Sequence, residues 1–132
     1  MISLREIGEG AFFDDGVIGI RAFCTGHTDK EENPTFGFLI EGKGKSVYIS
    51  SDLSASLSDL PLFLKEREID LAVVECAHFC ASDLVSRMEE WRARQCAVVH
   101  VMPSEKYADL IALARTSQKK ILFPSDADVI DL

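Results

Sequence analysis

The chain has 132 residues, which predicts one domain able to bury roughly two thirds of the surface of its unfolded state. Its composition, 47% hydrophobic and 27% charged, is ordinary for a globular protein, and no run approaches the roughly 20 apolar residues of a membrane span. The first residues carry no signal-peptide pattern, so we expect a cytoplasmic protein with no membrane partner. The formal net charge of -8 repels phosphate backbones and argues against non-specific nucleic-acid binding.

The first third of the sequence reads as β-strands. Residues 2–7 and 17–24 are β-prone and are separated by the Gly- and Asp-containing stretch 8–16, which we interpret as a connection. Residues 35–41 and 45–50 flank a short Gly-bearing link, which predicts a β-hairpin.

From Ser54 onward the apolar residues recur at helical spacing. Leu57, Leu60 and Leu64 predict a helix of about ten residues, with Pro61 tolerable only in its first turn. Two units of strand and helix follow. The expected strands are 71–74 and 97–99, and the expected helices carry Leu84 to Trp91 and Tyr107 to Ala114, the second with Ser104 as its N-cap. Strands 119–123 and 129–132 close the chain.

Strands alternating with helices predict an α/β fold, a mixed sheet with three helices on one face, because right-handed crossovers place consecutive helices on the same side. The runs 71–74 and 97–99 are apolar at every position, as in strands covered on both faces. We therefore expect something else to cover the second face, either another half of the fold or a second copy of the chain.

Groups able to ligate a metal follow several of these strands. His27, Asp52 and His100 each lie at the end of a strand-like run, and the ends of neighbouring strands meet at one edge of an α/β sheet. Imidazole and carboxylate are ligands of zinc, iron and manganese, so these three residues are the predicted metal ligands. The structural alternatives are a solvated loop histidine at 27, a helix cap at 52 and a core histidine bonded to backbone at 100.

Two further polar residues follow the run 71–74. Glu75 or His78 is expected to orient a ligand through a hydrogen bond or to act in proton transfer, and a structural polar pair is the alternative. Four cysteines complete the set of potential ligands. Cys76 and Cys80 would make only half of a zinc site, and we interpret these two, with Cys24 and Cys96, as structural free thiols in a reducing compartment.

The order of these motifs resembles the carboxyl-terminal half of the metallo-β-lactamase superfamily, in the branch of ribonuclease Z and the cyclic phosphodiesterase of phosphonate metabolism. The resemblance runs nearly the whole chain. It rests on His27, Thr35-Phe-Gly-Phe38, Ser51-Asp52, Glu75-Cys-Ala77, His100 and Asp126-Ala127. The chain departs from the family in lacking the His-x-His-x-Asp-His motif of the amino-terminal half, in the longer stretch 29–34, and in having Ser51 and Ala127 where the family has glycine.

The resemblance implies one half of an αβ/βα sandwich and a metal-dependent hydrolase. His27 would bind one metal, Asp52 would bridge two and His100 would bind the other. The divalent metals, zinc first with iron or manganese as alternatives, would activate a hydroxide held by Asp52 as the catalytic residue, for phosphodiesterase-type hydrolysis of a phosphodiester or another small molecule. Three ligands cannot close a site for two metals, so we expect the isolated chain to be inactive.

Two other functions are open. The chain could be a non-catalytic, structural half-domain that forms a homodimer or pairs with a separate amino-terminal half. It could also be a small α/β ligand-binding domain of another topology, in which the histidines are structural.

Overall fold

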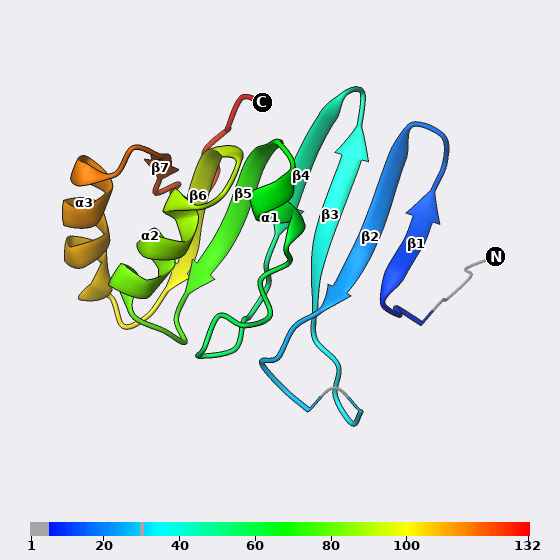
Figure 1. The fold of residues 1–132 in the computed structure, drawn as a ribbon, viewed down its shortest axis with the longest axis horizontal. Coiled ribbons are helices and arrows are strands. Elements are labelled where there is room, and N and C mark those ends of the chain that lie inside the picture. The colour runs from blue at the N-terminus through cyan, green and yellow to red at the C-terminus, as the bar shows by residue number, and fades with distance from the viewer. Residues whose placement is uncertain (1–5, 30) are drawn as a thin grey trace.

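The computed structural model describes residues 6–29 and 31–132, and it contains a single seven-stranded sheet in which the strands follow one another in sequence order (Figure 1). The strands are β1 (Gly10–Asp14), β2 (Ile18–Cys24), β3 (Phe36–Gly42), β4 (Lys45–Ile49), β5 (Ile69–Cys76), β6 (Ala93–Val101) and β7 (Lys120–Leu122). The helices among the described residues are α1 (Phe63–Glu66), α2 (Ala81–Glu89) and α3 (Lys106–Thr116). The α/β class and the mixed sheet with three helices are thus confirmed.

The first four strands form an antiparallel meander. The predicted hairpin is present: Gly42 pairs with Lys45, so β3 and β4 are joined by two residues. Both of these, Lys43 and Gly44, have positive φ values of 52° and 72°. A two-residue turn with both residues in the left-handed region matches the right-handed twist of the flanking strands, which fixes the register of the hairpin.

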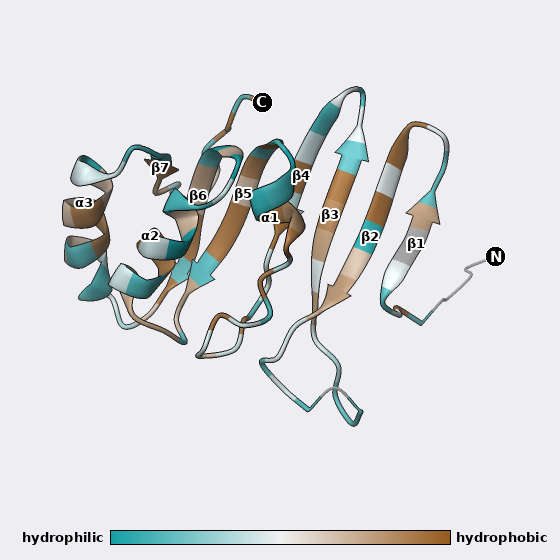
Figure 2. Cartoon of the chain, viewed as in Figure 1, coloured by the Kyte–Doolittle hydropathy of each residue, from teal (hydrophilic) through white to brown (hydrophobic). Residues whose placement is uncertain are grey.

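The last four strands are parallel, and each pair is connected through one helix. Figure 1 shows the three helices on the same side of the sheet, as right-handed crossovers require. The core lies between this face and the helices. Tyr48 of β4, Val74 of β5 and Val98 of β6 are at most 1% exposed and pack in one cluster with Leu84 and Leu110 of the helices. Figure 2 shows the corresponding apolar bands along β5 and β6.

The opposite face of the sheet is also apolar, and we call it the open face. Strand pairing places its residues in two rows: Ile40, Val47 and Leu71 in one, and Ile49, Val73 and Ala97 in the other. Ile40, Val47, Ile49 and Val73 remain partly exposed. The segment 129–132 reaches this face at one end, where the Gln95 side-chain amide donates to the Asp131 carbonyl over 2.8 Å.

The expected first strand is tested only in part. Residues 2–5 of the expected strand 2–7 lie outside the described residues, and residues 6 and 7 are not in a strand. The first strand among the described residues is β1, which lies within the stretch that we interpreted as a connection. Its pairing with β2 shifts between Ala11 and Phe13, and this irregularity breaks the alternation by which a strand is recognised.

The helix expected from Ser54 is also wrong, because only the single turn α1 forms. Side-chain bonds hold the preceding segment in an irregular path: the Asp59 carboxylate accepts the Ser54 N–H over 2.8 Å, and Leu57 has a φ of 56°. Leu57 and Leu64 are nevertheless buried, at 4% and 0% exposure. The leucine spacing therefore reflected packing of a loop, and short polar side chains competed with the helical backbone bonds.

Two expectations for the carboxyl-terminal part are corrected as well. α3 begins after Glu105 rather than Ser104, and no side chain caps it. Residues 129–132 form no strand. The strands predicted at 71–74, 97–99 and 119–123 are present as β5, β6 and β7. Among the described residues, no helix is long and apolar enough to cross a membrane.

Candidate metal site

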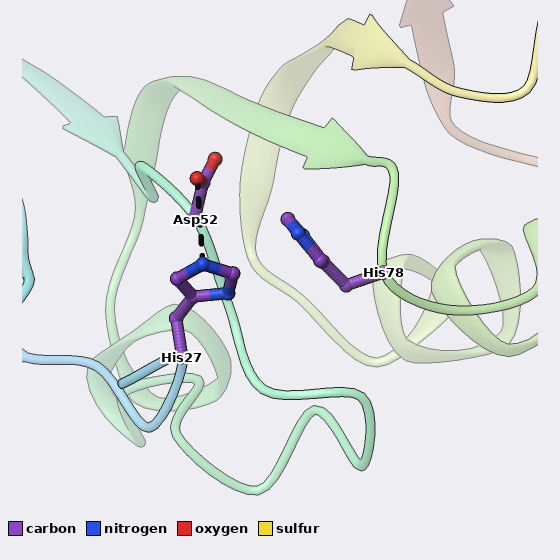
Figure 3. A group of neighbouring side chains, drawn as sticks. All are labelled: His27, Asp52 and His78. Atoms are coloured by element: carbon purple, nitrogen blue, oxygen red, sulfur yellow. Dashed lines mark ion pairs between the residues drawn. The ribbon is translucent and has the colours of Figure 1, made fainter. Parts of the chain in front are cut away.

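Four polar side chains from four different strand ends converge at the edge of the sheet where the parallel strands terminate. Asp52 lies between two histidines: its Oδ2 is 3.8 Å from His27 Nε2, and its Oδ1 is 3.1 Å from His100 Nδ1. The rings of His27 and His78 have their centroids 4.3 Å apart. Figure 3 shows His27 and His78 approaching Asp52 from separate loops.

His27 lies in the connection between β2 and β3. The two ends of this connection are tied together, because the Thr25 N–H donates to the Thr35 carbonyl over 2.9 Å and the two threonine hydroxyls are 2.6 Å apart. The adjacent Gly26 N–H donates to Asp59 Oδ2 over 2.6 Å. His27 is therefore carried by a loop that is anchored on both sides.

Asp52 follows β4 directly, and its position depends on an unusual backbone at the preceding residue. Ser51 has a φ of 52°, in the left-handed region that favours glycine. This turns the chain out of the strand direction before Asp52. No helix begins here, since α1 starts at Phe63, so the alternative in which Asp52 caps a helix is wrong.

His100 occupies a bulge near the end of β6. Glu75 of β5 pairs with Val99 and Cys76 pairs with Val101, so His100 has no partner in the parallel ladder between them, and its φ is 46°. A bulge redirects a side chain that regular pairing would place on one face. The His100 side chain is 47% exposed and contacts the Asp52 carboxylate, so the alternative of a buried core histidine is wrong.

Glu75 is a buried residue that holds the segments around the site in place. It is 2% exposed, and its Oε1 accepts hydrogen bonds from the Leu53 N–H over 2.9 Å and from His78 Nδ1 over 2.7 Å, while Oε2 accepts the Ala77 N–H. One carboxylate therefore joins the segment after Asp52 to the segment that carries His78. Because Nδ1 of His78 is bound to Glu75, only Nε2 of that ring is left to act as a ligand.

Lys106, in the first turn of α3, fixes the segment between β5 and α2. Its ammonium donates to three backbone carbonyls, those of Cys76 at 3.3 Å and of Ala77 and Phe79 at 2.8 Å each. These carbonyls flank His78, so the segment that carries His78 is held from two sides, by Glu75 and by Lys106.

The donor set fits a divalent metal ion. One ligand atom from each of His27, Asp52 and His78 lies within 4.8 Å of the other two, and two imidazoles with a carboxylate suit zinc, iron or manganese. His100 is outside this group of three but contacts its carboxylate. The structure thus brings together all five residues singled out in the sequence, and it places His78 beside His27 and Asp52.

No cysteine belongs to this group of potential ligands among the described residues. Cys76 and Cys96 are buried, Cys24 is partly buried and Cys80 is exposed, and all four are free thiols. Burial raises the pKa of the Cys96 thiol to about 12, and burial also raises the pKa of Cys76. A thiol whose pKa is raised is a poor ligand and nucleophile, in agreement with a structural role.

Two residues that support the site were not identified from the sequence. Asp59 was only a polar position within a predicted helix, and Lys106 was only the start of another helix. A carboxylate or an ammonium that folds back onto backbone groups far along the chain leaves no periodic pattern, and their positions depend on the tertiary fold.

No protein-family model and no curated protein sequence matches the chain. Solved structures do match it. The metallo-β-lactamase fold protein YhfI from Bacillus subtilis has a TM-score of 0.71 and 17% identity, over 90% of this chain and 52% of that protein. Human tRNase Z, short form, has a TM-score of 0.59 and 18% identity, over 92% and 44%. Zn²⁺-bound PqqB from Methylobacterium extorquens has a TM-score of 0.64 and 12% identity, over 94% and 54%.

The chain spans about half the length of these structures. The TM-scores of 0.59 to 0.71 establish a shared fold, and because the identities are below a fifth, the activity has to be argued from the site itself. The chain has the fold of metallo-β-lactamase-like proteins over the part of their length that it matches.

Proposed function

We propose that this chain is one half of a metal-dependent hydrolase domain and that its converging histidines and aspartate bind a divalent metal. The observation that carries the proposal is the position of Asp52, whose two oxygens face different histidines: Oδ2 faces His27 and Oδ1 faces His100. A carboxylate with this arrangement suits a bridging position between two metal ions. The solved structures of the same fold include Zn²⁺-bound PqqB, which supports zinc as the first ion to test.

In this proposal His27, Asp52 and His100 are the metal ligands, as the sequence suggests, and the geometry adds His78 as a further ligand. Glu75 holds the His78 ring so that Nε2 points away from it. The side chains of the three histidines and Asp52 are 28–47% exposed, so solvent and substrate have access to them. A bound metal would lower the pKa of a coordinated water toward about 7 and would polarise a phosphoryl or carbonyl oxygen.

The chain's own residues then orient the reactants. Asp52 is the residue placed to accept a proton or hold a hydroxide, because both of its oxygens lie at the centre of the cluster. A phosphodiester is the substrate class that we propose, since human tRNase Z shares the fold. We expect little or no turnover by the isolated chain, because the amino-terminal histidine cluster expected from the family resemblance is absent from its sequence.

Metal content tests the proposal directly. The purified chain, dialysed against a slight excess of Zn²⁺ and then against buffer, is analysed by inductively coupled plasma mass spectrometry together with His78→Ala and His100→Ala. We expect about one equivalent of zinc in the parent and a loss in His78→Ala at least as large as in His100→Ala. Zinc retained in both variants, with native circular dichroism, would overturn the assignment.

The open face supports a second function, a half-domain that pairs with another body. Its six apolar residues, defined above, include four that are partly exposed, and the matched structures are about twice as long as this chain. We propose that a separate amino-terminal half or a second copy of this chain covers these apolar residues. We also propose that the protein acts in the cytoplasm. Analytical ultracentrifugation of the parent and of Ile49→Asp tests the homodimer: we expect a dimer that this variant dissociates, whereas a monomeric parent at high concentration excludes it.

A further inference from the structure

Asp59 connects the two loops that carry His27 and Asp52. Its Oδ2 accepts the Gly26 N–H over 2.6 Å and the Ser54 N–H over 2.8 Å, and its Oδ1 accepts the Ser54 hydroxyl over 2.8 Å. Gly26 precedes His27 by one residue, and Ser54 follows Asp52 by two. One carboxylate therefore holds both loops through three hydrogen bonds.

The two loops are also in close contact at this point. A Cβ atom added to Gly26 would lie 3.2 Å from Ser54 Cβ and 3.5 Å from Asp59 Oδ2. Such a contact is tight, so the absence of a side chain at residue 26 allows the loops to approach closely enough for both to reach Asp59. The geometry of this junction is set by the Asp59 carboxylate together with the glycine.

The bonds to Asp59 are charge-assisted, which makes them stronger than bonds between neutral groups. Burial by itself would raise the pKa of Asp59, but the N–H groups of Gly26 and Ser54 and the Ser54 hydroxyl lower it below the ordinary value of 3.8. The carboxylate is therefore charged at neutral pH. Its three hydrogen bonds go to residues that lie next to His27 and near Asp52 in the sequence.

We propose that Asp59 is a positioning residue of the metal site: it sets the separation between His27 and Asp52 before any metal binds. This inference rests on the proposed function, since the geometry matters only if these two side chains share a ligand. Preorganisation of ligands by outer hydrogen bonds is worth roughly 10- to 100-fold in metal affinity. The alternative is a purely local role, in which Asp59 stabilises the loop without affecting His27.

The test compares four forms of the full chain. Asp59→Ala removes all three bonds. Asp59→Asn is the conservative variant, because its amide oxygen can accept both backbone N–H groups and its amide nitrogen can donate to the Ser54 hydroxyl. Asp131→Asn is the matched control, since Asp131 is exposed and lies in the carboxyl-terminal segment away from the site. Zinc affinity is measured by competition with a chromophoric chelator, and stability is measured by urea unfolding.

A readout in the metal-free protein separates this inference from the proposed function. In the parent, the rings of His27 and His78 are close enough for a nuclear Overhauser effect between their protons, and the Gly26 amide should be protected from hydrogen exchange although Gly26 is exposed. We expect Asp59→Ala to lose both signals and to bind zinc about tenfold or more weakly. Asp131→Asn should resemble the parent in both respects, and Asp59→Asn, which keeps the bonds but not the charge, should retain both signals and lose less zinc affinity than Asp59→Ala.

Each outcome decides the inference. Retention of the ring signal, the amide protection and the zinc affinity in Asp59→Ala would overturn it, and so would an unprotected Gly26 amide in the parent. A parent that binds no zinc would refute the proposed function, and the ring signal alone would then decide whether Asp59 positions His27. If Asp59→Ala does not fold, Gly26→Ala perturbs the same junction and should weaken zinc binding, and an unchanged affinity there would refute the inference.

Discussion

The buried carboxylate of Glu75 gives the sharpest prediction for stability. Glu75→Met has nearly the same shape but removes the acceptor for the Leu53 N–H, the Ala77 N–H and His78 Nδ1. Ala77 and His78 are partly exposed, so water can replace the lost bonds there, whereas Leu53 is 0% exposed and its N–H stays unsatisfied. An unsatisfied buried donor costs about 1–3 kcal/mol.

We therefore expect Glu75→Met to lower the free energy of unfolding by about 1–3 kcal/mol, and to lower Tm by about 3–15 °C for a chain of this size. The single tryptophan, Trp91, is 2% exposed, so its fluorescence reports urea unfolding. Glu66→Met is the matched control, because Glu66 is exposed on α1. A change below about 0.5 kcal/mol in Glu75→Met would refute the bonding network, since that is the range of ordinary surface substitutions.

Three other substitutions test separate features. Lys106→Met should destabilise the chain by about 1–3 kcal/mol in urea unfolding, because three carbonyls lose their donor, and Lys106→Arg should restore part of that loss; equal stability of both variants would contradict the role of the ammonium. Ser51→Gly should stabilise the chain by up to about 1 kcal/mol, since it relieves a left-handed backbone, whereas Ala108→Gly in α3 should destabilise it by a similar amount; both can be measured by thermal unfolding. Asp70→Asn should cost more stability at pH 7 than in acid, and the cost should shrink as the pH falls below 3.8. The Ser46 N–H, partly opposed by burial and reinforced by Lys45 and Arg94, holds the pKa of Asp70 below 3.8, so this stabilisation is present above that pH and is lost as the pH falls through the folded-state pKa. A difference in the free energy of unfolding between Asp70→Asn and the parent that does not change with pH would contradict this role of the Asp70 carboxylate.

The parallel half of the fold could be predicted from the sequence because its signals are local. The apolar runs 71–74 and 97–99 mark buried strands, and the period of Leu84 to Trp91 marks an amphipathic helix. The irregular path of the segment 54–64 could not be predicted. Its leucine spacing matches a helix, but the Asp59 carboxylate binds a backbone N–H of the segment instead. The choice between the two depends on a contact with Gly26, which lies 33 residues away.

The site was predictable to the extent that strand ends meet at one edge. That principle gathers His27, Asp52 and His100 without any knowledge of loop geometry. It does not give the order of contacts within the cluster. His78 lies beside His27 because Glu75 and Lys106 hold its segment, and His100 reaches Asp52 because of a bulge in β6, which no pattern in the sequence indicates.

Two residues that differ from the glycines expected from the family resemblance have positive φ values. Ser51 and Ala127, the positions at which the family resemblance leads to the expectation of glycine, have φ values of 52° and 69°. Both residues therefore adopt the left-handed backbone that glycine adopts most easily, at a cost of about 1–2 kcal/mol for each. The turn before Asp52 is the one of these two that lies at the candidate site.

The exposed ligands and the open face lead to one last prediction. If the body that covers the open face also supplies metal ligands, zinc and that partner must stabilise each other's binding by the same factor, because coupling free energies are reciprocal. The dissociation constant of the homodimer, measured by analytical ultracentrifugation, should then fall when zinc is added, and His78→Ala should abolish the change while leaving the zinc-free dimer intact. A dissociation constant that zinc leaves unaltered would mean that the second copy covers the apolar face without contributing to the site, and that any further ligands come from a different polypeptide.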